Sequence, residues 1–273
     1  MTTVRTSVPW MAQTRTFARR QLQQLRRNKM IVFLTVAWPV LWYFLTIEFF
    51  VDLPPGTDLG PMKAVNGINY GLFGAFTVTV AVFAGAFARD LEGNRYRKLR
   101  SMPIAPTADL AGRFVAGAVL GVASYLVTIL VAYAHGGAFG PLTIETVAIL
   151  ALTLGSFCLI AMALAMMIAL VVTKPEQMTT IAIVMALMAY FVTGFNGSSP
   201  EMLAEGAEMV NYLPNSLATR LQIAHWVGAE NFGSMTPPEA PDSIEYVGIL
   251  LGYATASLAV SIAVIRRIAY GGD

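Results

Sequence analysis

The hydrophobic and charged positions of this chain fall into long, separate blocks. Residues without Asp, Glu, Lys or Arg form six stretches: 30–47, 64–88, 114–144, 146–173, 177–200 and 246–265. About 20 apolar residues are enough for a helix to cross a bilayer. The pattern predicts one all-α integral membrane domain over residues 1–273, with six transmembrane helices at about 30–50, 66–88, 110–134, 145–172, 176–195 and 245–266.

Composition supports a membrane protein. Only 12% of the 273 residues are charged, compared with about 25% in soluble domains. This excludes a soluble enzyme and a nucleic-acid binder, and six spans exclude a single-pass anchor. The first span is expected to be retained, because no small-x-small cleavage site follows it. The single cysteine, Cys158, lies within a span and excludes a disulfide framework.

The basic residues predict the orientation. Sixteen of the 18 Lys and Arg residues fall on one side of the predicted spans, and only Lys63 and Arg220 fall on the other. Basic residues accumulate on the cytoplasmic side of membrane proteins. We therefore expect a multi-pass protein of the plasma membrane with both termini in the cytoplasm.

Small residues recur at helical spacing within three of the spans. The rows are Gly67, Gly71, Ala75 and Thr79; Gly117 and Gly121; and Gly248, Gly252 and Ala256. Such rows let helix backbones approach closely in a membrane. Because small residues are also common in membrane helices generally, we expect at least two of the three rows to be helix contacts.

Residues 9–29, before the first span, have the pattern of an amphipathic helix. Pro9 suits the first turn of a helix. At about 100° per residue, one arc holds the apolar residues Trp10, Met11, Phe17, Ala18, Leu22 and Leu25, and the opposite arc holds Arg15, Arg19, Arg20, Arg26 and Arg27. This predicts a helix in the membrane interface, in contact with lipids. The alternative is an ordinary basic flank.

The segment 89–109 carries charges of both signs. A simple membrane flank needs only basic residues, so the mixture favours a docking element for another protein, with a solvated loop as the alternative. Pro103 and Pro106 are expected to stop any helix, and Thr107 and Asp109 are expected to cap the next span. The candidate coupling residues are Arg89, Asp90, Glu92, Gly93, Arg97, Leu99, Arg100 and Pro103.

This segment resembles the cytoplasmic loop of the permease subunit of type-2 ABC exporters. The resemblance rests on an acidic residue, a glycine, a Leu-Arg pair and a proline, here Glu92, Gly93, Leu99, Arg100 and Pro103. It implies a second permease copy, a homodimer rather than a heterodimer, and two copies of a separate ABC ATPase subunit docked on the loop. ATP and Mg would be bound by that partner, with no cofactor in this chain.

The segment 196–244 is predicted to be extracellular and to hold two short helices. Ser199-Pro200-Glu201 has the pattern of a helix start, and Leu213-Pro214 separates it from a second apolar set that begins at Leu217. The family resemblance implies that these helices are re-entrant. A simple external loop is the alternative.

Motifs for catalysis are missing from the sequence. It has no phosphate-binding loop of the GxxxxGK[ST] type, and His135 and His225 lack partners at metal-ligand spacing. We therefore expect neither a catalytic nor a metal site. No charged residue lies deep in a predicted span, which disfavours an ion-coupled carrier. The alternative to a permease is a polytopic scaffold that transports nothing.

Overall fold

The computed structural model describes residues 8–50, 56–93, 104–172, 174–192, 212–231 and 243–270. These residues contain helices and no strand, which confirms the all-α class. The helices are α1 (Trp10–Arg26), α2 (Lys29–Leu45), the π-helical η1 (Thr46–Phe50), α3 (Gly60–Glu92), α5 (Pro106–Ala134), α6 (Ile144–Val171), α7 (Met178–Val192), α8 (Pro214–Trp226) and α9 (Ile244–Tyr270), with short 3-10 turns at Pro175–Gln177 and Ala229–Asn231.

Among the described residues, five helices are long and apolar enough to cross a membrane. They are Lys29–Phe50, Gly60–Glu92, Thr107–Ala134, Ile144–Val171 and Ile244–Arg267. The helix at the place of the expected fifth span, α7, has 15 residues, which corresponds to about 22 Å of helix. That is less than the roughly 30 Å of a bilayer core. Five spans are thus seen where six were expected, and the sixth stays a prediction.

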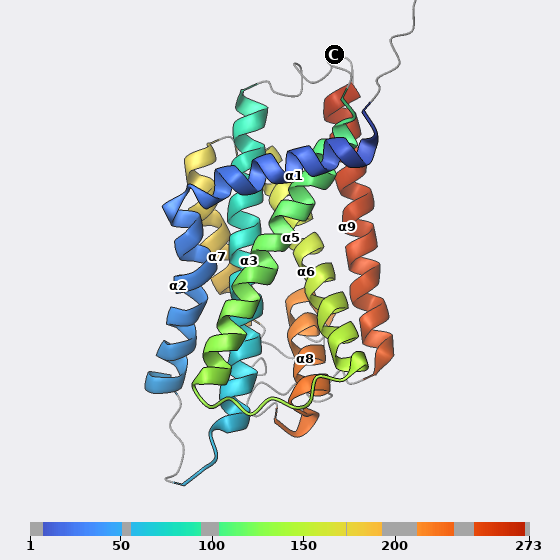
Figure 1. Ribbon diagram of the computed structural model, residues 1–273. Coiled ribbons are helices and arrows are strands. Elements are labelled where there is room, and N and C mark those ends of the chain that lie inside the picture. Colours follow the sequence, from blue (N-terminus) through green and yellow to red (C-terminus); the bar gives the residue numbers. More distant parts are fainter. Residues whose placement is uncertain are drawn as a thin grey trace, which may run out of the picture.

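The bundle is built around α3, which packs against α2, α5, α6, α7 and α8. In the most hydrophobic stretch of α3, 94% of the residues are buried. In that of α9, at the edge of the bundle, only 22% are buried. Figure 1 shows α1 lying across one end of the bundle and α8 at the opposite end. The two short helices therefore lie at opposite ends of the bundle, α1 packed on α5 and α8 on α3 and α6.

Two of the three rows of small residues are helix contacts, as expected. A Cβ atom added to Gly67 of α3 would lie 2.5 Å from the Cβ atom of Ala132 of α5, and one added to Gly121 would lie 2.6 Å from Sγ of Cys158 of α6. The third row differs, because a Cβ atom added to Gly248 or Gly252 meets nothing within 4 Å. This face of α9 is open in the part of the chain that the structure describes.

A single methyl group at Gly67 is expected to destabilise the bundle. The Cβ atom of Ala132 is fixed to its backbone and cannot rotate away, so Gly67→Ala must separate α3 from α5. We expect a loss of about 1–3 kcal/mol of unfolding free energy, measured as a lower unfolding temperature in detergent. The control is Gly155→Ala, because a Cβ atom there meets nothing within 4 Å. An equal response of both variants would contradict the prediction.

The boundaries around the expected cytoplasmic loop are different from the prediction. The helix α3 continues through Glu92, so Arg89, Asp90 and Glu92 are helical. The next helix begins at Pro106, whose missing N–H suits the first turn. Thr107 and Asp109 therefore do not cap it, and that expectation was wrong: both lie inside the helix, where their side chains bind Trp10 and Arg113.

The turn between α1 and α2 has a cap that sequence reasoning missed. The side chain of Asn28 accepts hydrogen bonds from the backbone N–H groups of Met30 (3.0 Å) and Ile31 (3.4 Å). Asparagine is among the preferred residues at this position. Its signal was hidden inside a segment that reads as one continuous helix, 9–29. The cap turns the chain from α1 into the first span.

One of the two short helices expected between the last spans is present as α8. It has 13 residues and begins at Pro214, with half-exposed Leu213 before it and fully buried Leu217 in its first turns. Contacts with α3, α6 and α9 hold it in place. Ser199, Pro200 and Glu201 lie outside the described residues. Whether α8 is re-entrant stays a prediction.

Among the described residues, the largest fully buried side chain is that of Arg220 in α8. Its guanidinium donates a hydrogen bond to the Ser216 hydroxyl. Neighbouring polar side chains tie α8 to the spans: Gln222 donates to Thr153 of α6 (2.9 Å) and Asn215 to the backbone oxygen of Ala189 of α7 (3.2 Å). The sequence placed Arg220 only in an outer segment. Its burial follows from the packing of α8, which one-dimensional patterns do not show.

Candidate functional site

A buried ion-pair network joins α3 to α5 at the end of the bundle that carries α1. The Arg113 side chain of α5 is 3% exposed, and its Nε donates to Asp109 Oδ2 at 2.9 Å. Its Nη2 pairs with the Asp90 carboxylate in the last turn of α3. We call these three residues the Asp90–Arg113–Asp109 network. It lies at the base of the segment 94–103, where several candidate coupling residues fall.

This network explains how the two helix ends are held in register. Asp109 and Arg113 are four residues apart, so they meet on one face of α5, and the planar guanidinium can bind two carboxylates at once. Removing one member of a buried ion pair leaves a charge without compensation and costs about 3–5 kcal/mol. The sequence contained the Asp-x-x-x-Arg spacing, but nothing in it indicated that Asp90 would complete the network.

The helix α1 is anchored on the first two turns of α5. The indole Nε1 of Trp10 donates to Thr107 Oγ1 at 3.1 Å, and the backbone N–H of Ala105 donates to Gln13 Oε1 at 3.0 Å. Farther along, Gly112 lies so close to α1 that an added Cβ atom would be 2.9 Å from the Thr14 oxygen. The start of α5 thus binds both α1 and α3.

The predicted amphipathic helix is present, but part of its apolar face packs on protein. Ala18 and Leu25 are buried and Phe17 and Leu22 are half-buried, whereas Trp10 and Met11 are exposed. The five arginines of the basic arc are exposed, namely Arg15, Arg19, Arg20, Arg26 and Arg27. Helix α1 therefore uses two surfaces, one for α5 and one for its surroundings. Its position in the membrane interface stays a prediction.

A polar groove of about 270 Å³ brings α1 together with two of the candidate coupling residues. Arg89 and Asp90 from the end of α3 line it, together with Arg20, Gln21, Gln24, Leu25, Asn28, Ile31 and Ala86. Glu92 and Gly93 follow at the exposed end of α3. Arg97, Leu99, Arg100 and Pro103 lie outside the described residues, so their role stays a prediction.

His135 makes structural contacts between helices. His135, at the end of α5, contacts the Tyr43 hydroxyl through Nδ1 (3.1 Å) and the Glu48 carboxylate through Nε2 (3.5 Å). Its backbone oxygen accepts a hydrogen bond from Lys63 (2.9 Å). These contacts join α2, α3 and α5 at the end away from α1. Within the described ranges, no three His, Cys, Asp or Glu residues are grouped to hold a metal ion.

Comparison with known families decides the class of protein to which this site belongs. Residues 12–213 match the membrane-domain family described as ABC-2 type transporter. The chain belongs to this family. It is therefore the multi-pass permease of an ABC transporter, the transmembrane component and not itself the ATPase. No curated protein matches the chain. The match begins inside α1 and includes the Asp90–Arg113–Asp109 network.

Proposed function

We propose that this permease is the membrane subunit of an ATP-driven type-2 ABC exporter. It works as a dimer, a homodimer in the simplest assembly, and two copies of a separate ABC ATPase subunit bind ATP and Mg. The family match supports an ATPase partner, since permeases of this family generally work with one. The observation that carries the proposal is the junction of α1, α3 and α5 at the base of segment 94–103.

The junction offers a physical route from the loop to the spans. A force applied to segment 94–103 acts on the end of α3 and the start of α5 together, because Arg113 ties the two helices. Helix α3 contacts three of the other four long helices, α2, α5 and α6, and also α7. A shift of its end is therefore expected to reach most of the transport pathway. Glu92, Arg97 and Arg100 are proposed to form ion pairs with the ATPase.

The proposed orientation places α1 and the loop on the cytoplasmic side of the membrane. It rests on the charge bias, with sixteen of the 18 basic residues on that side. Both termini are then cytoplasmic and the protein lies in the plasma membrane. The open faces of α2 and α9, whose most hydrophobic stretches are 33% and 22% buried, leave apolar surface for lipid and for a second copy.

Co-purification tests this function. The permease and the ABC ATPase encoded beside it are expressed together and purified in detergent, as wild type and as the Glu92→Ala/Arg100→Ala variant. Wild type is expected to retain the ATPase, and the variant is expected to retain at least about tenfold less. A tenfold loss requires a loss of only about 1.4 kcal/mol of binding free energy. Retained protein and ATP hydrolysis are measured together.

A matched control removes two exposed charges from the other end of the bundle. Glu145 and Glu245 are exposed at the starts of α6 and α9, and Glu145→Ala/Glu245→Ala is expected to retain the ATPase like wild type. If wild type itself retains no ATPase, the exporter proposal fails and the non-transporting scaffold replaces it. If both variants lose it equally, the loop is not the docking element.

A further inference from the structure

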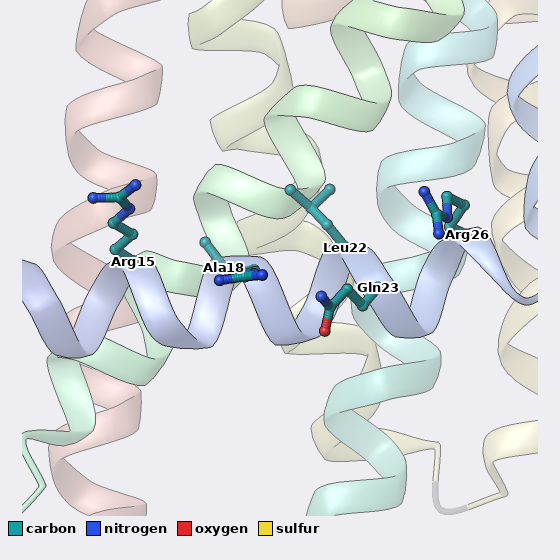
Figure 2. Close-up of a pocket in the computed structure, with 6 residues that line it drawn as sticks. Arg15, Ala18, Leu22, Gln23 and Arg26 are labelled. Carbon is teal, nitrogen blue, oxygen red and sulfur yellow. The ribbon is translucent and has the colours of Figure 1, made fainter.

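A second groove runs along the other edge of α1 (Figure 2). It measures about 430 Å³, and its described lining consists of Arg15, Ala18, Arg19, Leu22, Gln23 and Arg26. The spacing of residues 15, 19, 22 and 26 places them on one face of the helix. Figure 2 shows the side chains of Arg15, Ala18, Leu22 and Arg26 on the same side of α1. Three guanidinium groups thus border one groove.

This groove faces the membrane-spanning part of the bundle. Gln13 and Trp10 reach the first turn of α5 at Ala105 and Thr107. Successive residues of a helix are rotated by about 100° around its axis. Around the axis of α1, the centre of the groove therefore lies about 150° from each of these two side chains. It therefore opens away from the start of α5, toward the length of the spans. Arg20, about 130° around the helix from the centre of this groove, lines the polar groove near Asp90 instead.

An apolar surface continues from the groove along α5. Helix α1 covers α5 at Gly112. On that same face of α5, a stripe of exposed apolar residues continues at helical spacing, and Val115 and Val119 are each 47% exposed. Its further members are Val122, Leu126 and Leu130. A molecule in the groove could thus place an acidic group at α1 and a hydrocarbon chain along α5.

The charge and the lining of this groove indicate which kind of molecule it binds. The sequence from Val8 to Asn28 contains five arginines and no acidic residue. Arginine binds phosphate oxygens bidentately, while Ala18 and Leu22 provide an apolar floor between the guanidinium groups. We propose that this groove binds the headgroup of an anionic glycerophospholipid from the leaflet in which α1 lies, with its acyl chains on the Val115–Val119 stripe. The proposal rests on the predicted position of α1 in the membrane interface, and the identity of the leaflet rests on the proposed orientation.

Lipid titration of the full-length protein tests the proposal. The chain is purified in a neutral detergent and titrated with dioleoyl phosphatidylglycerol or dioleoyl phosphatidylcholine, and bound lipid is counted by native mass spectrometry. Wild type is expected to bind phosphatidylglycerol at least tenfold more tightly than phosphatidylcholine. The variant Arg15→Gln/Arg19→Gln/Arg26→Gln is expected to lose this preference.

The matched control removes the same number of charges outside the groove. Arg20, Arg27 and Lys29 are exposed, and Arg20→Gln/Arg27→Gln/Lys29→Gln is expected to keep the wild-type preference. Leu22→Glu, which places a carboxylate in the groove, is expected to weaken phosphatidylglycerol binding without removing any arginine. Unfolding temperatures of all variants establish that they are folded.

Three results would overturn the proposal. The first is that the triple groove variant still prefers phosphatidylglycerol as strongly as wild type. The second is that the matched control loses this preference to the same extent, which would indicate only general attraction of the lipid to the basic helix. The third is displacement of phosphatidylglycerol by glycerol phosphate, which would indicate a free-anion site without lipid chains. None of these results bears on ATPase binding, so this test and the co-purification can fail independently.

Discussion

Replacement of Arg113 with methionine is expected to lower the free energy of unfolding by about 3–5 kcal/mol. The Arg113 side chain is 3% exposed, and both Asp90 and Asp109 contact it. Its removal leaves two carboxylates close together, and the Asp109 side chain is only 2% exposed. The measurement is thermal or denaturant unfolding of the purified chain in detergent.

Two further variants distinguish lost charge balance from lost packing. Asp90→Asn/Asp109→Asn/Arg113→Met removes all three charges and is expected to recover much of the stability, because neutral replacements of a buried ion network can be tolerated. Arg19→Met, at an exposed position of α1, is expected to change stability by less than about 0.5 kcal/mol. If Arg113→Met unfolds like wild type, the network does not hold α3 to α5.

A methyl group at Gly112 is expected to detach α1 from α5. The added Cβ atom would lie 2.6 Å from Cβ of Phe17 and 2.9 Å from both the backbone nitrogen of Ala18 and the backbone oxygen of Thr14. Backbone atoms cannot rotate out of the way, so Gly112→Ala must move the whole helix at a cost of about 1–3 kcal/mol. Amide hydrogen exchange across residues 10–26 is expected to become at least tenfold faster.

The same variant tests the link between α1 and coupling. If α1 steadies the start of α5, Gly112→Ala is expected to reduce ATPase retention together with amide protection. Gly248→Ala is the control, because its added methyl group meets nothing within 4 Å, and it should leave exchange in α1 unchanged. Unchanged exchange in Gly112→Ala would show that α1 is not fixed through this contact.

The spans and the N-terminal helix could be predicted from the sequence because their signals are local. An uncharged run such as 146–173 must satisfy its backbone internally in lipid, and a helix is the simplest way to do so. Gly67 and Gly121 were also found, since only small residues at i, i+4 spacing permit such close packing. The same argument failed for Gly248, because spacing does not show which face of a helix has a neighbour.

Errors at the start of α5 have a related cause. Thr107 and Asp109 suit a helix start, but Pro106 takes the first position of the helix, and the two side chains are used by Trp10 and Arg113 instead. Trp10 belongs to α1 and reaches Thr107 only after folding. Arg113 lies four residues after Asp109 on α5, and it also pairs with Asp90 of α3. Contacts of these side chains, within α5 and with other helices, therefore took the place of capping.

By itself, the sequence determined that this protein is a helical membrane protein with a basic amphipathic helix before its first span. Hydropathy, charge and helical period are properties of neighbouring residues, so no partner is needed to read them. Only the tertiary structure decided that Asp90 meets Arg113, that Arg220 is buried, and that three arginines of α1 border a groove on one side of that helix. These facts depend on which face each helix presents to helices distant in the chain. Side-chain packing across the helix interfaces determines that face.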